Sequence, residues 1–353
     1  MHKKEKIKLF FLFLGVVAVM AAFWLVLRHF EGGVDAKMTD EFLIDDTEQI
    51  EAEAVEADKS PVGTIKLNGD KYDYYDELET YLIIGTDASG NESGSGEEYR
   101  GNMADFLLLM VIDKTANEYG FLQLNRDAMT EVNLISRDGS GEATAEIQLC
   151  TAHWYGGNSE MSCNNTVTAV SKMLGGIPID GYYAMNMDDI PKLNQEVGGV
   201  EVTLEEDFSD VDSAMVKGTT LTLTDEQAYH YIHDRYGVGD EKNTSRMKRQ
   251  KQYMKGLMEK IKQKVKSEPA FLNKVFSKYK KEATTNISSG KLSRMAEAMN
   301  VSKSKGTLVL KGENKVGQAL GDGIDHAEFY PSCESLVEVM TKLCNLQKRQ
   351  NET

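Results

Sequence analysis

The sequence contains little of what would assign it to several well-known classes. Among its 353 residues are five prolines, two tryptophans and four cysteines. Four cysteines in a chain of this length do not make a disulfide scaffold, and no Cys/His spacing suggests a zinc site. The sequence has no glycine-rich phosphate loop and no internal repeat. These absences argue against a zinc protein, a P-loop nucleotidase and a repeat protein.

The cysteines form two pairs with different prospects. Cys150 and Cys163 are thirteen residues apart around a predicted loop and could form a disulfide. Cys333 and Cys344 fall in a segment with helical periodicity, where eleven residues separate them by about 16 Å, too far for a bond. We expect the second pair to be two small buried residues.

The formal charge of the chain is unevenly distributed. The whole chain carries a net charge of −16, and residues 31–80 hold sixteen acidic residues against four lysines. This stretch therefore contributes −12, and the remainder is close to balanced. Repulsion between like charges favours an extended linker here.

An apolar segment near the N-terminus has the length of a membrane-spanning helix. Residues 7–27 are apolar apart from Lys8, which is about the length needed to cross a bilayer. Basic residues precede the segment, so the positive-inside rule predicts a cytoplasmic N-terminus and an extracytoplasmic remainder. The alternative is a cleaved signal peptide. Trp24 and Arg28 leave no small-residue cleavage site, which favours a retained single-pass anchor in the cell membrane.

Five regions follow from these patterns. They are a basic cytoplasmic stub (1–6), a transmembrane helix (7–27), an acidic linker (28–78), a main domain (79–300) and a C-terminal strand and helix extension (301–353). Within the main domain, apolar runs at 81–85, 106–112 and 119–124 predict buried strands. Helical periodicity follows at 165–174, 188–197, 224–235, 245–265 and about 269–300. Interleaved strands and helices predict an α/β fold, a three-layer α-β-α sandwich with a central mixed sheet.

Two carboxylates and one guanidinium should meet at one rim of this sheet. Residues 113–117 read as a hairpin turn, which sets Asp105 opposite Arg126 at the open end. Asp87 follows the preceding strand and emerges at the same end if that strand is parallel to the third. Ligand sites of α/β proteins lie at such rims. A simple surface salt bridge is the competing interpretation.

Two later helices add further polar groups. Arg235 follows Ala228, Tyr231 and Ile232 on one apolar stripe, where an arginine needs an anionic partner. Arg246 and Gln250 share one face at the start of the next helix. A helix N-terminus favours anions, and arginine binds phosphate oxygens through a bidentate fork. A solvated basic face is the alternative, above all for Lys248.

These residues lie in stretches that together resemble the LytR-CpsA-Psr family of cell-wall glycopolymer transferases. The resemblance covers about residues 81–253, roughly half of the chain. Each stretch is weak alone, and their order and spacing carry the resemblance. The matching stretches are Ile84-Gly85-Thr86-Asp87, Ala104-Asp105-Phe106-Leu107, Asn125-Arg126-Asp127, Tyr155-Gly156-Gly157, Ile177-Pro178-Ile179-Asp180, Val197-Gly198-Gly199-Val200-Glu201-Val202 and Arg246-Met247-Lys248-Arg249-Gln250.

The resemblance implies a membrane-anchored phosphotransferase. It would move a glycopolymer from a polyprenyl-pyrophosphate carrier to a peptidoglycan hydroxyl, with the lipid tail in an apolar tunnel and Mg²⁺ at the pyrophosphate. Asp87 and Asp105 resemble the metal-binding carboxylates, and with Arg126 they would form the catalytic group. The residues that resemble the pyrophosphate ligands are Arg126, Arg235, Arg246, Arg249 and Gln250.

The sequence departs from the family pattern at three places. Met103 stands where the family usually has arginine, and Arg100 could replace it. His233 replaces the first of two arginines at the end of a helix, which leaves Arg235. Gln148-Leu149-Cys150 stands in place of Lys-Ile-Asn. These changes bear on activity and substrate more than on the fold.

Three other functions remain open for the same chain. Water could replace the sugar as acceptor, which would make the protein a lipid pyrophosphate hydrolase. Met103 and His233 would also suit a non-catalytic protein that binds polyprenyl phosphates. Transcriptional control is disfavoured, because the main domain is nearly neutral and is expected to face away from nucleic acid.

Overall fold

The computed structural model describes residues 60–87, 101–136, 138–141, 143–267, 282–288 and 302–350, and the single residues Phe271, Val275, Lys278, Tyr279 and Lys291. The expected transmembrane segment 7–27, Arg100 and most of the expected helix 269–300 lie outside this range. Among the helices that are described, none combines the length and the apolar character needed to span a membrane.

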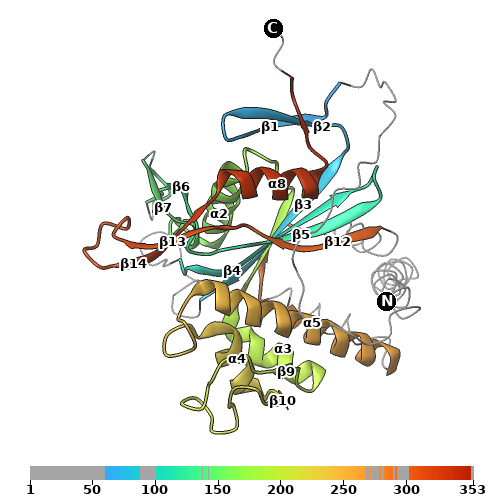
Figure 1. The fold of residues 1–353 in the computed structure, drawn as a ribbon, viewed down its shortest axis with the longest axis vertical. Helices are drawn as coiled ribbons and strands as arrows, with labels where there is room; N and C mark the ends of the chain where they lie inside the picture. The colour runs from blue at the N-terminus through green and yellow to red at the C-terminus, as the bar shows by residue number, and fades with distance from the viewer. Residues whose placement is uncertain are drawn as a thin grey trace, which may run out of the picture.

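A six-stranded mixed sheet forms the centre of the molecule (Figure 1). Its strand order is β11-β8-β3-β4-β5-β12. β3 pairs antiparallel with β4, and β4 pairs antiparallel with β5, while β8 and β12 run parallel to their neighbours β3 and β5. The strands are β3 (Leu78–Thr86), β4 (Ala104–Asp113), β5 (Glu118–Leu124), β8 (Gly181–Asn186), β11 (Thr284–Thr285) and β12 (Lys303–Val309). The predicted mixed sheet is confirmed.

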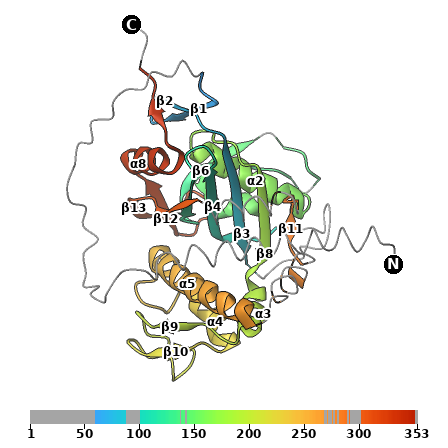
Figure 2. The ribbon, with the colours of Figure 1, turned by 90° about the vertical axis from the view of Figure 1, so that its right-hand side faces the viewer.

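Helices pack against this sheet in two groups (Figure 2). α2 (Ser159–Met173) and α8 (Cys333–Cys344) pack on one face. α3 (Ile190–Val197), α4 (Asp225–His233) and α5 (Asn243–Ser267) form a second apolar cluster, and the first half of α5 contacts β5 through Gln123. Side chains alternate between the faces of a strand, so Leu82 and Leu109 join the first cluster while Tyr81 and Met110 face away from it. The sheet is therefore buried on both sides.

Part of the expected acidic linker is folded. β1 (Gly63–Leu67) and β2 (Asp70–Tyr74) form an antiparallel hairpin, and β15 (Gln347–Lys348) pairs with β2. Ile65 and Leu67 are 1% exposed and belong to the core that includes α8. The high acidic content concealed this alternation of buried and exposed residues.

The C-terminal region is built into the domain. β12 is the edge strand beside β5, and α8 covers the sheet, as the predicted strand and helix required. β13 (Gly312–Gly317) and β14 (His326–Pro331) form a hairpin. The Phe329 N–H donates to the Asp127 carbonyl oxygen at 2.8 Å. Cys344 is buried as expected, whereas Cys333 is exposed, and all four cysteines are free thiols.

The remaining elements are short. They are β6 (Met129–Asn133), β7 (Thr144–Gln148), η2 (Leu149–His153), η3 (Met187–Asp189), β9 (Glu201–Thr203) and β10 (Thr220–Thr222). α4 begins with a capping box, in which Thr224 and Gln227 exchange side-chain and backbone hydrogen bonds. The helix ends at His233, two residues earlier than predicted, because Asp234 adopts an extended backbone conformation.

Candidate active site

The β4–β5 hairpin brings Asp105 and Arg126 together. Leu107 pairs with Leu124, and the same register carried two residues outward sets Asp105 opposite Arg126. The Arg126 Nη1 donates to Asp105 Oδ1. The predicted pairing at the open end of the hairpin is confirmed.

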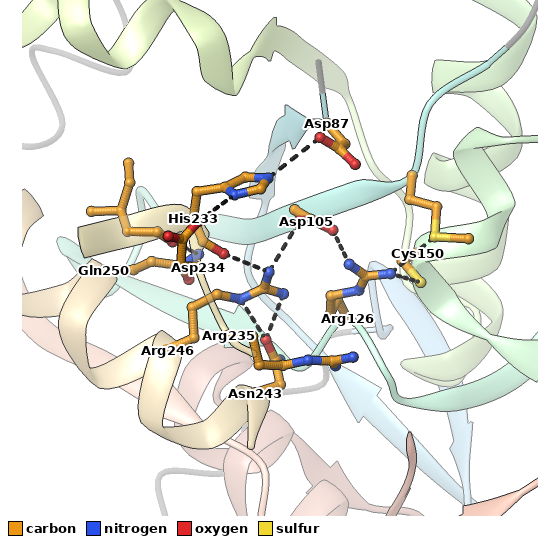
Figure 3. Close-up of polar contacts among 12 residues, drawn as sticks. Asp87, Asp105, Arg126, Cys150, His233, Asp234, Arg235, Asn243, Arg246 and Gln250 are labelled. Atoms are coloured by element: carbon orange, nitrogen blue, oxygen red, sulfur yellow. Dashed lines mark hydrogen bonds and ion pairs between the residues drawn. The ribbon is translucent and has the colours of Figure 1, made fainter. Parts of the chain in front are cut away.

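Arg246 contacts the same carboxylate from the opposite side. It lies in the first turn of α5, and its Nη1 donates to Asp105 Oδ2 at 3.0 Å. Its Nε and Nη2 both donate to Asn243 Oδ1, at 3.0 and 2.7 Å. Asp105 and Arg246 are 5% and 2% exposed. One buried carboxylate therefore bridges two guanidinium groups from elements far apart in the sequence (Figure 3).

Asp127 holds the third arginine. Arg235 lies just beyond α4, and its Nη1 donates to Asp127 Oδ2 at 3.1 Å. Asp127 Oδ1 also lies 3.4 Å from Arg126 Nε. The apolar stripe predicted an anionic partner for Arg235 without identifying it. The position of Asp127 directly after Arg126, at the same strand end, was the available signal.

Asp87 emerges at this end of the sheet, as the predicted strand directions require. Its backbone N–H donates to the Met103 carbonyl oxygen at 2.9 Å, and the Asn102 Nδ2 donates to the Asp87 carbonyl oxygen. His153 supports Asn102, because its Nδ1 donates to the Asn102 carbonyl oxygen at 2.9 Å. The Asp87 side chain is 36% exposed, so it is accessible from solvent while its backbone is fixed.

His233, the last residue of α4, faces Asp87. Its Nε2 lies 3.4 Å from Asp87 Oδ1, and its Nδ1 lies 3.1 Å from Asp234 Oδ1. Hydrogen bonds to Asp234 and then to Asp87 raise the pKa of His233 to about 9, against the effect of burial. The imidazole stacks on Tyr229, with ring centroids 4.7 Å apart. Tyr229 and His233 are four residues apart on one helix, so the sequence could have indicated this contact.

Asp87, Asp105 and His233 could together hold a divalent cation. One ligand atom each from Asp87, Asp105 and His233 lie within 4.8 Å of one another. Mg²⁺ is commonly held by one or two carboxylates together with substrate phosphates and water. The two carboxylates named by the sequence analysis thus suit the expected ion.

An apolar cavity of about 110 Å³ adjoins the polar group. It lies between the sheet and the helices α3, α4 and α5, and Gln250 takes part in its lining. Gln250 Nε2 donates to the Ile232 carbonyl oxygen at 3.2 Å, and its Oε1 accepts from Gln123 at 3.2 Å. The other lining residues are Ile83, Ile84, Gly85, Phe106, Met185, Asn186, Met187, Ile190, Leu193, Ile232, Tyr253 and Met254.

Comparison with known proteins places the chain. The LytR_cpsA_psr family matches residues 33–342, which is most of the sequence. The chain belongs to the LytR-CpsA-Psr family. Its described fold is similar to that of gbs0355 from Streptococcus agalactiae, with a TM-score of 0.59 and 22% identity over 78% of this chain and 90% of the other. It is also similar to TagV from B. subtilis, with a TM-score of 0.53 and 22% identity over 76% and 96% of the two chains.

Curated relatives in this family match at similar identity. The polyisoprenyl-teichoic acid–peptidoglycan teichoic acid transferase TagU of Bacillus cereus is 27% identical over 203 residues, 58% of each chain. The Biofilm regulatory protein A of Streptococcus mutans is 27% identical over 241 residues, 66% of this chain and 56% of the other. The match therefore spans a little over half the length of these curated relatives.

Arg249 contacts groups other than Asp87 and Asp105. Its Nη1 donates to Glu206 Oε2, its Nε donates to the Tyr231 carbonyl oxygen at 2.8 Å, and its Nη2 donates to the Asp234 carbonyl oxygen. The guanidinium also lies over the Phe208 ring, 5.1 Å from its centroid. Arg249 thus joins the end of α4 to the loop after β9, while Arg126 and Arg246 contact Asp105 and Arg235 contacts Asp127.

Two of the departures from the family pattern, Met103 and Cys150, contact Arg126. Its Nη2 lies 3.0 Å from Met103 Sδ and 3.1 Å from Cys150 Sγ. Burial raises the pKa of the Cys150 thiol, so a neutral sulfur faces the guanidinium. Gln148 points elsewhere, since its Nε2 donates to the Ala327 carbonyl oxygen at 3.2 Å. Arg126 is therefore enclosed by soft sulfur atoms on one side and carboxylates on the other.

Proposed function

We propose that the protein is a membrane-anchored phosphotransferase of cell-wall assembly. It would transfer a glycopolymer from a polyprenyl-pyrophosphate carrier to a peptidoglycan hydroxyl, on the extracytoplasmic side of the cell membrane. The observation that carries this proposal is the convergence of three guanidinium groups and two carboxylates beside an apolar cavity. A lipid diphosphate is complementary to both parts of this site, because it has a head of high negative charge and an apolar tail.

The charges of the site are balanced in a way that suits an anionic ligand. Arg126 and Arg246 share Asp105, and Arg126 and Arg235 share Asp127. Mg²⁺ held by Asp87 and Asp105 would offset part of the negative charge of the diphosphate and polarise its oxygens. With Asp105 engaged there, the guanidinium groups of Arg126 and Arg246 could turn to phosphate oxygens, for which their planar forks are suited.

The same residues account for the transfer step. The oxygen of a peptidoglycan hydroxyl attacks the phosphorus that carries the polymer, and the bond from that phosphorus to the bridging oxygen breaks. The lipid phosphate leaves, and Arg126, Arg235 and Arg246 stabilise the charge that grows on it. Asp87, the more exposed carboxylate, is the group that would accept the hydroxyl proton, because Asp105 is buried between two arginines.

The apolar cavity is the proposed entrance for the lipid tail. Its volume of about 110 Å³ is below the roughly 300–1,000 Å³ of typical ligand pockets, so the tail must widen it. Three methionines, Met185, Met187 and Met254, line the cavity. Their unbranched side chains can change shape at low cost.

The relatives support the same assignment. TagU of Bacillus cereus and TagV of Bacillus subtilis are both described as polyisoprenyl-teichoic acid–peptidoglycan teichoic acid transferases. Because their matches cover 58% and 45% of those proteins, the polymer and the acceptor of this chain remain part of the proposal.

Product analysis tests the proposal against its alternatives. The purified full-length chain is incubated with a glycopolymer linked to a short-chain polyprenyl pyrophosphate, with and without peptidoglycan fragments. A transferase attaches polymer to the fragments and releases little without them, a hydrolase releases polymer in both cases, and a binding protein leaves the substrate intact. Arg126→Ala should lower the rate by about 10²–10³-fold. Release independent of peptidoglycan, or an intact substrate, would refute the transferase.

A further inference from the structure

The His233 imidazole is oriented like a metal ligand. A histidine that binds a metal through one ring nitrogen almost always donates a hydrogen bond from the other, often to a carboxylate. Here Nδ1 faces Asp234 Oδ1 at 3.1 Å, which leaves Nε2 directed toward Asp87. The stacked Tyr229 ring fixes the plane of the imidazole.

Arg246 holds this imidazole close to the second carboxylate. Its Nη1 donates to the His233 carbonyl oxygen at 3.2 Å and to Asp105 Oδ2 at 3.0 Å. The C-terminal end of α4 is thereby tied to the start of β4, and Asp105, Asp87 and His233 each present one ligand atom within a 4.8 Å group. Three ligands come from three different elements, so the site forms only in the folded domain.

We propose that His233 Nε2 is the third protein ligand of the divalent cation held by Asp87 and Asp105, and that it directs the site toward a first-row transition cation. Mg²⁺ strongly prefers oxygen ligands, whereas imidazole favours cations that are softer than Mg²⁺. Mn²⁺ accepts both oxygen and imidazole nitrogen ligands. A site with two carboxylates and one imidazole should therefore bind Mn²⁺ more tightly than Mg²⁺.

This inference rests on the proposed function only in taking the cation to be held by Asp87 and Asp105. A competing role for His233 is a direct cationic contact to the diphosphate, as the arginine usual at this position would make. That role predicts no nitrogen ligand on the cation, so the two are separable without any measurement of transfer.

The test is Mn²⁺ binding to the purified full-length chain, followed by electron paramagnetic resonance with and without competing Mg²⁺. We expect one tight site, with hyperfine coupling from a directly bound nitrogen. His233→Ala and His233→Arg should each weaken Mn²⁺ binding by about 10–100-fold, remove the nitrogen coupling and leave Mg²⁺ affinity nearly unchanged. Asp87→Asn should weaken the binding of both cations.

His326→Ala is the matched control. His326 also contacts an aspartate, Asp322, at 2.9 Å, and lies on the exposed loop side of β14. The His326→Ala variant should bind Mn²⁺ with the wild-type affinity. Wild-type Mn²⁺ affinity in His233→Ala, or a cation without nitrogen coupling, would overturn the inference even if the transfer reaction is observed. Nitrogen-ligated Mn²⁺ in a chain that transfers no polymer would instead refute the proposed function alone.

Discussion

Replacing Asp105 with asparagine tests the electrostatic balance of the site. The Asp105 side chain is 3% exposed, and each of its oxygens accepts from a different guanidinium, that of the largely buried Arg126 and that of the buried Arg246. Asparagine preserves the shape and removes the charge, so Arg126 and Arg246 face a neutral amide. Removing one partner of a buried ion pair costs about 3–5 kcal/mol, and the remaining contacts to Asp127 and Asn243 favour the lower half of that range.

This loss should be measurable as a lower melting temperature. In a domain of this size 1 kcal/mol corresponds to about 2–4 °C, so Asp105→Asn should melt roughly 6–16 °C below the wild type in metal-free buffer. Circular dichroism or calorimetry provides the measurement. The added substitution Arg246→Met, which removes one unpaired cation, should restore part of the loss, and a double-mutant cycle gives the coupling.

Asp70→Asn is the control for the same chemical change. Asp70 pairs with Lys348, and their side chains are 41% and 58% exposed. An exposed pair contributes at most about 1 kcal/mol, so this variant should melt close to the wild type. If Asp105→Asn also melts within about 2 °C of the wild type, the buried guanidinium groups do not depend on this carboxylate and the reasoning is refuted.

Three further predictions concern residues around the site. Arg249→Met should lower the melting temperature, because it removes the contact with Glu206. The affinity for inorganic pyrophosphate, measured by calorimetry, should stay at the wild-type value. A loss of pyrophosphate affinity would instead make Arg249 a ligand. Burial lowers the pKa of His153 to about 4, below its unfolded value near 6.5, so the neutral imidazole contributes stability above pH 6.5 that is lost as the pH falls toward 4. In denaturant unfolding, the wild type should lose roughly 3 kcal/mol more of its free energy of unfolding between pH 6.5 and pH 4 than His153→Gln does. An equal dependence of the unfolding free energy on pH in the two proteins would contradict this. Leu193→Trp should narrow the apolar cavity and raise KM for a long-chain lipid substrate by about tenfold. This is the effect expected if two methylenes of the tail lose burial, at about 0.8 kcal/mol each. KM for a short-chain analogue should not change. Equal effects on both substrates would place the tail elsewhere.

Local patterns in the sequence predicted the sheet and half of the site. The apolar runs and the turn at 113–117 specify a hairpin register, and that register alone sets Asp105 opposite Arg126. The direction of β3 then places Asp87 at the same rim. These features depend on residues close together in the chain, where periodicity and turn chemistry are informative.

Contacts between distant segments were harder to predict. The sequence indicated a partner for Arg235, but choosing Asp127 requires the position of α4 over the sheet. Arg249 and Arg246 are three residues apart on one basic helix, and only the packing of α5 directs one to Glu206 and the other to Asp105. The hairpin of β1 and β2 was concealed because it lies within a stretch of acidic composition, although its exposed positions hold Thr64, Lys66 and Lys71. Its buried tyrosines, Tyr72 and Tyr74, are explained by α8, which follows more than 250 residues later.

The most direct test of the central claim is mass spectrometry of lipid that copurifies with the chain from its own membrane. The central claim is that arginines from β5 and α5 hold one lipid diphosphate beside the apolar cavity. We expect polyprenyl phosphate or pyrophosphate to be bound to the wild type and absent from the Arg126→Ala/Arg246→Ala variant. A wild-type chain that retains no such lipid, or a double variant that retains equal amounts, would contradict it.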